Sequence, residues 1–256
     1  MAKSKIIYNK KINDNYFTMS ISASSETLKA KPGNFIMLKT NKNNLVYDPL
    51  LRRSFAVSDI EDANIIITYK VLGKGTLDLT YFNSSDYIET TEPLGNSFSY
   101  PLNNKNIAII AGGVGIAPFP LLFKKLLNHS NNIDIYYGGK SKDDIVLLEK
   151  FKAANNIIIT TEDGSMGNKG LITDYINKEY EFAFVCGPNA MMRNVIQKLN
   201  RTCEVQISME ERMACGIGLC MGCIVNLHEE TMKNKKCCKD GPIFNGRKVV
   251  WQNLNN

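Results

Sequence analysis

The sequence is poor in the features that mark several common classes of protein. It holds only two histidines, His129 and His228, and neither has a partner pattern that would make it a metal ligand or a catalytic base. We therefore expect no acid–base triad and no catalytic side chain of that kind. The longest stretch without charge, residues 107–123, is interrupted by glycine and proline and is too short for a membrane span. We expect a protein that does not enter the membrane.

Blocks of charge and export signals are also missing. The net charge is +6 over 256 residues, and Lys and Arg are spread along the chain, so we expect no nucleic-acid partner. The first residues lack the apolar stretch of a secretory signal, and the expected location is the cytoplasm, where thiols stay reduced. The length and the 44% hydrophobic content fit two globular domains with a small appendage.

Cysteine, in contrast, is plentiful and clustered. Cys215, Cys220 and Cys223 have the C-x4-C-x2-C spacing of plant-type 2Fe-2S ligands, with a fourth thiolate expected from further along the chain. Their loop, CGIGLCMGC, is rich in glycine, which lets several thiolates and backbone N–H groups face one point. Zinc and disulfides are the alternatives. Zinc usually takes two C-x2-C knuckles, and this sequence has only one, which counts against zinc. We predict an iron–sulfur cluster, with Cys238 or its neighbour Cys237 as the fourth ligand.

The first part of the chain, residues 1–101, is β-rich. Runs of strand composition are separated by turn sequences, such as Lys31-Pro32-Gly33. Many short strands in such a segment predict a closed antiparallel β-barrel. The expected strands lie within residues 16–23, 34–39, 54–57 and 64–71.

The second part, residues 102–209, alternates between two patterns. Short apolar runs of β type are separated by segments of helical length, and this alternation predicts a doubly wound parallel sheet. The apolar runs are residues 107–111, 133–137, 157–161, 182–186 and 203–209, and the helical segments are 117–128, 142–153 and 189–200. The last part, residues 210–256, shows little periodicity, and we expect its cluster to hold it together.

The first strand of the second part leads directly into a glycine-rich turn, residues 111–118 (AGGVGIAP). A strand, such a turn and a helix form a phosphate site, because exposed N–H groups and the positive helix end face the anion. Gly113 and Gly115 fit the G-x-G-x-x-G pattern, while Pro118 takes the place of the third glycine. A proline is tolerated in the first helical turn. A tight turn without a ligand is the alternative.

Two stretches of the β-rich part contain residue types that suit a flavin. Residues 52–57 (RRSFAV) place guanidinium groups in an apolar strand, and the forked donors of Arg match a pyrophosphate. Residues 69–76 (YKVLGKGT) combine permissive glycines with a hydroxyl. Alone, each stretch is explained more simply as surface arginines or a plain turn.

Cys186 ends the fourth expected strand of the parallel sheet. Ligands of open α/β sheets bind at the carboxyl ends of strands, so this thiol could line a nicotinamide pocket. A buried, inert cysteine is the alternative.

Taken in order, these pieces resemble the ferredoxin–NAD(P)H reductase family, in which a flavin barrel precedes a nucleotide domain with a GGxGxAP turn. Residues 208–225 (SMEERMACGIGLCMGCIV) and 238–244 (CKDGPIF) make the resemblance narrower. They are similar to the electron-transfer subunits of two-subunit, NAD-dependent dihydroorotate dehydrogenases. The resemblance covers essentially the whole chain.

Carried over residue by residue, the resemblance implies three binding regions. Ala56 stands where the flavin strand motif usually ends in Ser, and Glu92 replaces the first glycine of a GPLGN turn. The fourth cluster ligand precedes Lys-Asp-Gly-Pro in the family, which favours Cys238 over Cys237. The implied FAD contacts are Arg53, Ser54, Phe55, Ala56, Thr68, Tyr69, Lys70, Gly75 and Thr76. The implied NAD contacts are Gly112, Gly113, Gly115 and Pro118, to which its place in the sheet adds Cys186. The implied 2Fe-2S ligands are Cys215, Cys220, Cys223 and Cys238.

The resemblance also implies a reaction. In such enzymes an FMN-containing catalytic partner subunit oxidises dihydroorotate to orotate, a step of de novo pyrimidine (UMP) biosynthesis. Electrons then cross singly through the 2Fe-2S cluster to FAD, which passes a hydride to NAD+. The implied assembly is a heterotetramer of two subunits of each kind. NAD rather than NADP rests on the resemblance, since residues 137–141 (YGGKS) include a Lys and a Ser that could accept a 2′-phosphate.

Two alternatives stay open. The same scaffold serves as the FAD and 2Fe-2S subunit of an NADH-dependent ferredoxin:NADP oxidoreductase or of a hydrogenase-type diaphorase. A protein of another class, whose cluster senses redox state or oxygen, would need no nucleotide turnover.

Overall fold

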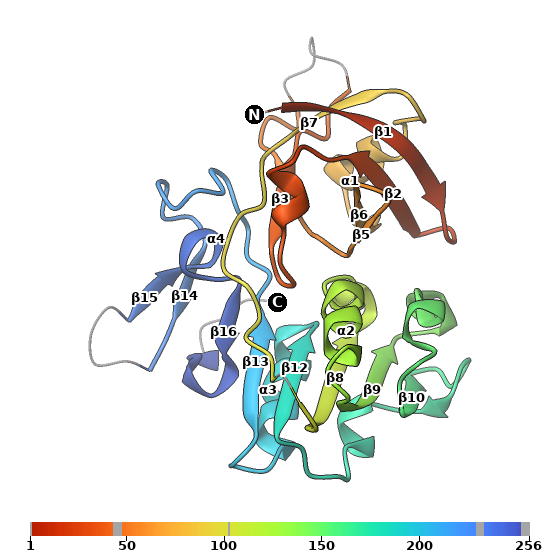
Figure 1. Cartoon of the computed structure of the whole chain (residues 1–256), viewed down its shortest axis with the longest axis vertical. Helices are drawn as coiled ribbons and strands as arrows, with labels where there is room; N and C mark the ends of the chain where they lie inside the picture. Colours follow the sequence, from red (N-terminus) through yellow and green to blue (C-terminus); the bar gives the residue numbers. More distant parts are fainter. Residues whose placement is uncertain (1, 43–47, 102, 229–232, 252–256) are drawn as a thin grey trace.

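The computed structural model describes residues 2–42, 48–101, 103–228 and 233–251. Figure 1 shows a β-barrel above a parallel sheet with helices, and the cysteine-rich segment lies alongside both. Within the described residues, no helix is long and apolar enough to cross a membrane.

The barrel is built from seven antiparallel strands in the order β4-β3-β7-β1-β2-β6-β5. The two strands at the ends of this order, β4 and β5, follow one another directly in the chain. The connection between them therefore brings the two edges of the sheet together. β4 pairs with β3, whereas β5 pairs with β6, and the N–H of Ser58 between them bonds to Ile66 O at 2.9 Å. The predicted closed barrel is therefore confirmed. The strands are β1 (Ala2–Lys11), β2 (Tyr16–Ser22), β3 (Phe35–Leu38), β4 (Arg53–Ala56), β5 (Asp59–Glu61), β6 (Asn64–Lys70) and β7 (Tyr87–Thr90).

The second sheet has the order β11-β10-β9-β8-β12-β13-β16 and is parallel except for β16. The order reverses between β8 and β12, which makes their carboxyl ends the expected ligand crevice. The predicted doubly wound sheet is confirmed. Its parallel strands are β8 (Asn106–Gly112), β9 (Asn132–Gly139), β10 (Asn156–Thr161), β11 (Asn168–Lys169), β12 (Phe182–Cys186) and β13 (Glu204–Ser208). Its helices are α2 (Phe119–Leu127) and α3 (Asn189–Lys198).

One expected helix, residues 142–153, is absent. The segment forms two short 3-10 helices instead, Lys142–Asp144 and Leu148–Phe151, and Leu147 between them has a left-handed φ of 61°. The residues at 145–147 are apolar and all buried. A left-handed residue cannot continue a right-handed helix, so the segment does not form one α-helix across Leu147.

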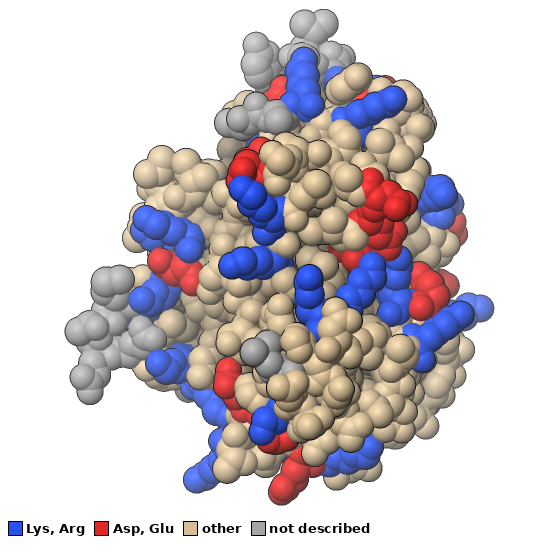
Figure 2. All heavy atoms as spheres, viewed as in Figure 1, with Lys and Arg blue, Asp and Glu red and all other residues tan. Residues whose placement is uncertain are grey.

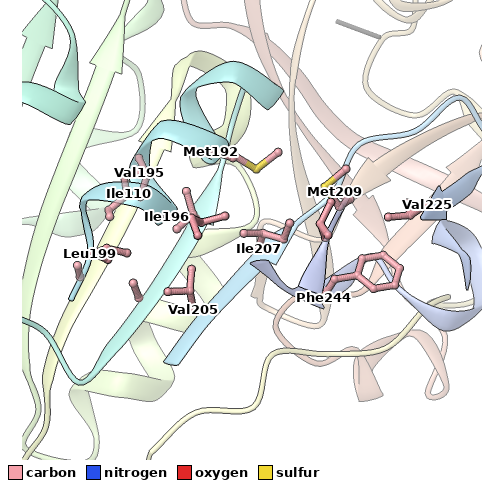
Figure 3. Packing of buried hydrophobic residues seen from close by; sticks show 14 of the residues in the cluster. Ile110, Met192, Val195, Ile196, Leu199, Val205, Ile207, Met209, Val225 and Phe244 are labelled. Carbon is pink, nitrogen blue, oxygen red and sulfur yellow. The ribbon is translucent and has the colours of Figure 1, made fainter. Parts of the chain in front are cut away.

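The cysteine-rich segment shares its core with the nucleotide domain. Its strand β16 (Ile243–Asn245) pairs antiparallel with β13 and extends the second sheet. Figure 3 shows Val225 and Phe244 of this segment in one packed cluster with Ile207 of β13 and Ile196 of α3. The segment is therefore held by apolar packing and strand pairing against the nucleotide domain. Its other elements are β14 (Ile224–Asn226), β15 (Asn234–Lys236) and α4 (Cys237–Asp240).

Candidate functional site

The four cysteines predicted to hold the cluster come together from one loop and one short helix. Cys223 and Cys238 are buried, and their sulfur atoms lie 3.3 Å apart. The loop directs backbone N–H groups at sulfur, from Gly218 to Cys238 Sγ at 3.1 Å and from Leu219 to Cys215 Sγ at 3.3 Å. Gly218 has a φ of 81°, a left-handed conformation that favours glycine. This explains why the loop is rich in glycine.

The electrostatics of these thiols favour a bound cation. Burial and then the neighbouring Cys223 thiol raise the pKa of Cys238 to about 12. The backbone N–H groups of Cys220 and Ile217 instead lower the pKa of Cys215 to about 6. Two adjacent buried thiols cannot both ionise without a compensating positive charge, which iron would supply. The arrangement therefore fits the group that the spacing predicts.

The cysteines are arranged in pairs. Among the described residues, no three Cys, His, Asp or Glu side chains gather as ligands of a single metal ion. A 2Fe-2S cluster does not require that, because four thiolates are shared between two irons. Cys223 and Cys238 fit one pair, which leaves Cys215 and Cys220 as the other. Cys237 is turned away, with its Sγ 3.5 Å from Met209 O.

Residues 215–223, which we call the cluster loop, lie against the barrel. They are one strand away from the predicted flavin strand, β4. A Cβ on Gly216 would lie only 2.9 Å from Met37 Cγ, so the loop touches β3 directly. Met37 pairs in register with Ser54 of β4. The predicted cluster and the predicted flavin strand are thus separated by the width of a single β-strand.

Several predicted flavin contacts gather beside β4. A Cβ on Gly75 would lie 3.1 Å from Arg53 Nε, so the strand and the first turn of helix α1 (Lys74–Leu79) are neighbours. Thr76 Oγ1 accepts the N–H of Leu72 at 2.9 Å and shapes that turn. Four buried polar atoms of the barrel have no hydrogen-bond partner in the part of the chain that the structure describes, and one of them, Asp59 Oδ2, forms an ion pair with Lys124 instead. The other three are as expected where a polar ligand binds. They are Thr40 Oγ1, Arg52 Nε and Thr68 Oγ1.

Other predicted flavin residues point elsewhere. Phe55 and Tyr69 form an edge-on pair in the barrel core, and the Tyr69 hydroxyl donates to Asn9 Oδ1 at 3.1 Å. Burial raises the pKa of Tyr69 to about 12, so the hydroxyl stays protonated. Lys70 forms an ion pair with Asp144 of the nucleotide domain at 2.6 Å. Backbone groups of these positions therefore suit a flavin better than their side chains.

The predicted nucleotide turn lies at the sheet crevice, and its glycines have different roles. A Cβ on Gly115 would lie 2.4 Å from Cys186 O, and one on Gly112 would lie 2.7 Å from Met191 Sδ. These two glycines are required by close packing against the turn that follows β12. Gly113 has a φ of 53°, and its open side faces the Tyr16 hydroxyl at 3.5 Å.

The other two predicted nucleotide contacts flank this turn. Pro118 stands at the start of α2. Cys186 ends β12 with its side chain buried, and burial followed by Glu210 raises the pKa of its thiol. The thiol therefore stays protonated and is no nucleophile.

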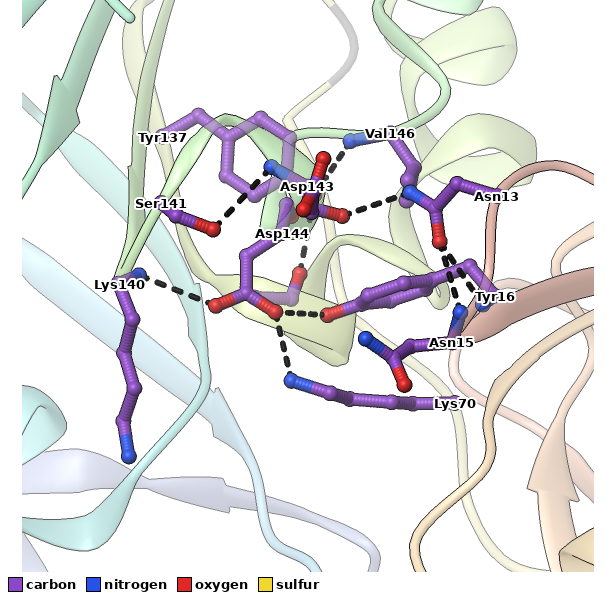
Figure 4. A network of polar contacts seen from close by, with 11 residues as sticks. Asn13, Asn15, Tyr16, Lys70, Tyr137, Lys140, Ser141, Asp143, Asp144 and Val146 are labelled. Atoms are coloured by element: carbon purple, nitrogen blue, oxygen red, sulfur yellow. Dashed lines mark hydrogen bonds and ion pairs between the residues drawn. The ribbon is translucent and has the colours of Figure 1, made fainter. Parts of the chain in front are cut away.

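A buried polar network, which the sequence patterns do not reveal, joins the barrel to this edge of the sheet (Figure 4). The Asp144 carboxylate accepts the Tyr16 hydroxyl at 2.8 Å, Lys70 Nζ at 2.6 Å and the N–H of Lys140 at 3.1 Å. Burial alone would raise the pKa of Asp144, but the bonds from Lys70 and Tyr16 lower it below its ordinary value. Asp144 is therefore an ionised link between the two domains.

Two further ion pairs join the barrel to the nucleotide domain. Lys124 of α2 pairs with the buried Asp59 at 2.6 Å, and Lys150 pairs with Glu61 at 2.6 Å. On the face of the molecule seen in Figure 2, Lys and Arg side chains are interspersed with Asp and Glu.

Comparisons with known proteins agree with this architecture. The iron–sulfur cluster binding domain of dihydroorotate dehydrogenase B matches residues 210–250, and the oxidoreductase NAD-binding domain matches residues 109–197. A solved structure of an NADH-dependent reduced ferredoxin–NADP oxidoreductase covers 99% of this chain and 92% of its own, with 27% identity and a TM-score of 0.85. A Neisseria gonorrhoeae ferredoxin NADP+ reductase with bound FAD and NADP shares the fold at 15% identity, with a TM-score of 0.63 over 77% of this chain and 89% of its own.

Two relatives are similar over nearly the full length. Both are electron transfer subunits of dihydroorotate dehydrogenase B (NAD+). The protein of Caldanaerobacter subterraneus subsp. tengcongensis is 34% identical over 97% of this chain and 98% of its own length. The protein of Clostridium acetobutylicum is 36% identical over 96% of each. The chain therefore belongs to the family of electron transfer subunits of NAD-dependent dihydroorotate dehydrogenase B.

Proposed function

We propose that this chain carries electrons from a dihydroorotate-oxidising partner subunit to NAD+, through a 2Fe-2S cluster and FAD. The observation that carries the proposal is the contact between the cluster loop and the barrel. Gly216 lies against Met37, which is one strand from the flavin motif at Ser54. A relay needs its two centres close together, and this packing supports that requirement. The partner and its substrate are inferred from the relatives' name.

The overall reaction balances without a side-chain acid or base in this chain. Dihydroorotate loses two electrons and two protons to become orotate, NAD+ gains two electrons and one proton as a hydride, and one proton enters solvent. Bound FAD supplies the exchange between single electrons and hydride, which a one-electron cluster cannot perform. The chain's own residues bind the groups, orient them and keep them close. Transfer of single electrons to the cluster fits a partner subunit that carries FMN. In this proposal the assembly is a heterotetramer of two subunits of each kind.

Each part of the chain has a separate task in this proposal. Residues 1–101 hold FAD, residues 102–209 bind NAD at the glycine turn, and residues 210–256 hold the cluster. Arg53 supplies the charge for the flavin pyrophosphate, beside Gly75 in the first turn of α1. Gly113 offers the open backbone for the nicotinamide nucleotide. Seven cysteines without disulfides suit work in the reducing cytoplasm.

A second candidate function has a specific observation in its favour. The solved NADH-dependent reduced ferredoxin–NADP oxidoreductase matches 99% of this chain with a TM-score of 0.85. In that case the electrons would be exchanged with ferredoxin rather than with dihydroorotate. The electron donor therefore separates the two functions.

The test is dihydroorotate-dependent NADH formation by this chain co-purified with its catalytic partner subunit. We expect activity in the wild type, none in Cys220→Ser, and normal activity in Cys203→Ala, whose sulfur lies outside the cluster loop, 3.8 Å from Glu204 O. Activity that survives Cys220→Ser would show that electrons bypass the cluster. Reduction by ferredoxin but not by dihydroorotate would favour the second function.

A further inference from the structure

The barrel ends in a turn, residues 93–96, that is fixed against strand β3. The backbones of Leu94 and Phe35 exchange two hydrogen bonds, of 2.8 and 3.2 Å. Asn34, which precedes β3, donates from Nδ2 to Asn96 O at 3.0 Å. The turn is therefore part of the barrel and not a free linker to the nucleotide domain.

The side chain of Asn96 holds the cysteine-rich segment as a neighbouring strand would. Its Oδ1 accepts the N–H of Ile243 at 2.9 Å, and its Nδ2 donates to Ile243 O at 2.8 Å and to Asp240 O at 3.1 Å. Its own N–H donates to Gly241 O at 2.6 Å. Ile243 belongs to β16, which ends the sheet on the side away from β13. Although Asn96 is itself exposed, it satisfies backbone groups of a buried residue.

The turn packs closely against residues 240–243 of the cysteine-rich segment, which we call the corner. This packing leaves no space for an added side-chain carbon. Gly95 has a left-handed φ of 77°, and a Cβ there would lie 2.6 Å from Pro242 Cδ and 2.7 Å from Gly241 O. Gly33 is similarly close, since its Cβ would lie 2.9 Å from Ile243 Cγ1. Close packing limits the distance between the barrel and the corner. The hydrogen bonds of Asn96 determine which residues of the corner lie opposite the turn.

The same corner carries the predicted fourth cluster ligand. Helix α4 places Cys238 directly before the corner, and the Asp240 carboxylate closes this turn by accepting the N–H of Lys236 at 2.7 Å. Asn96 bonds to the carbonyl of the same Asp240. We propose that Asn96 is a positioning residue that fixes Cys238, and with it the cluster, relative to the flavin strand β4. The inference rests on the proposed function, because it takes Cys238 and β4 as the sites of the two redox centres.

The experiment compares Asn96→Ala, Asn96→Asp and Asn96→Ser in the full chain loaded with FAD and cluster. Hydrogen exchange of the peptide covering residues 239–245 in the oxidised protein reports the bonds directly. We expect it to be about tenfold faster in Asn96→Ala, because a hydrogen-bonded amide loses its partner. Asn96→Asp keeps the size of the side chain and the acceptor oxygen, but it turns a carboxylate toward two carbonyl oxygens. Exchange in Asn96→Asp should therefore be at least as fast as in Asn96→Ala. Asn96→Ser retains a short polar group and should be intermediate.

The second readout separates positioning from loss of stability. With NADH as reductant, flavin reduction should keep its wild-type rate, while the later bleaching of the cluster should slow several-fold, with iron content and the spectrum of the reduced cluster unchanged. Asn64→Ala is the matched control, because its amide bond to Asp62 O stays within the barrel. Since NADH supplies the electrons, the result does not depend on whether dihydroorotate is the donor.

Two results would overturn the inference. One is wild-type exchange of residues 239–245 in Asn96→Asp and Asn96→Ala. The other is cluster bleaching that keeps its wild-type rate, or that slows by the same factor as flavin reduction. Failure of dihydroorotate to reduce the wild-type assembly would instead count against the proposed function and leave the role of Asn96 standing.

Discussion

Asp144 links the barrel to the nucleotide domain, and replacing its carboxylate should lower the stability of the protein by an amount that can be calculated. In Asp144→Asn the shape is kept, but the ionised acceptor of Lys70 and Tyr16 is lost. Hydrogen bonds to charged groups contribute about 1.5–3 kcal/mol each, and an amide can replace part of this, so we expect a loss of about 2 kcal/mol. In a chain of this size that corresponds to a fall in Tm of about 4–8 °C. Asp174→Asn, an exposed change in the same domain, is the matched control.

The sign of the pH dependence follows from the lowered pKa of Asp144. A carboxyl whose native pKa is lowered contributes stability above its unfolded pKa of about 3.9, and this contribution is lost as the pH falls through the native value. The difference in Tm between wild type and Asp144→Asn should therefore be constant near neutral pH and shrink in acid. In a double-mutant cycle with Tyr16→Phe, the two effects should be non-additive.

The assay is thermal unfolding of the FAD- and cluster-loaded protein at a series of pH values. An unchanged Tm in Asp144→Asn at pH 7 would show that the Asp144 carboxylate does not stabilise the contact between the two domains. So would a difference that is the same at every pH, since the lost stability would then not come from ionised Asp144.

Three further predictions concern the binding regions. Gly115→Ala should abolish most NADH-driven dye reduction, because its Cβ would lie 2.4 Å from Cys186 O, whereas Gly73→Ala, where the added Cβ meets nothing within 4 Å, should be neutral; equal activities would contradict the packing argument. Arg53→Met should weaken FAD binding about tenfold to a hundredfold in a titration, since one charge-assisted bond is lost, and unchanged affinity would remove Arg53 from the flavin site. Cys220→Ser should lose the cluster absorbance and keep FAD, and joint loss of both would show that the two sites are not independent.

The sequence predicts the nucleotide domain well because its strands are buried on both faces. Residues 107–111 and 182–186 are almost entirely apolar, so the β runs are continuous and easily seen. Strand β1 (Ala2–Lys11) carries no such signal, because its ten residues include four lysines. It forms through pairing with β2 and β7, which are partners that only the closed barrel supplies.

The cysteine spacing predicts a set of cluster ligands, and the structure brings the sulfur atoms of two of them, Cys223 and Cys238, to 3.3 Å from one another. Side-chain direction and long-range contacts, in contrast, cannot be predicted from the sequence. Residues 69 and 70 belong to one motif, yet Tyr69 faces the barrel core and Lys70 faces Asp144. Asp144 and Asn96 act through partners far away in the chain, and a single sequence contains no periodic signal for such pairs. In a strand, neighbouring side chains point to opposite faces, so a motif match cannot say which of them meets a ligand.

The most direct test of the electron relay is a single anaerobic turnover of the purified assembly of this chain and its partner. Dihydroorotate is added first, and flavin and cluster absorbance are followed before NAD+ is supplied. We expect dihydroorotate to bleach both centres and NAD+ to reverse the bleaching with formation of NADH. If dihydroorotate leaves both centres oxidised while NADH bleaches them, the redox module stands and the assignment to dihydroorotate oxidation is wrong.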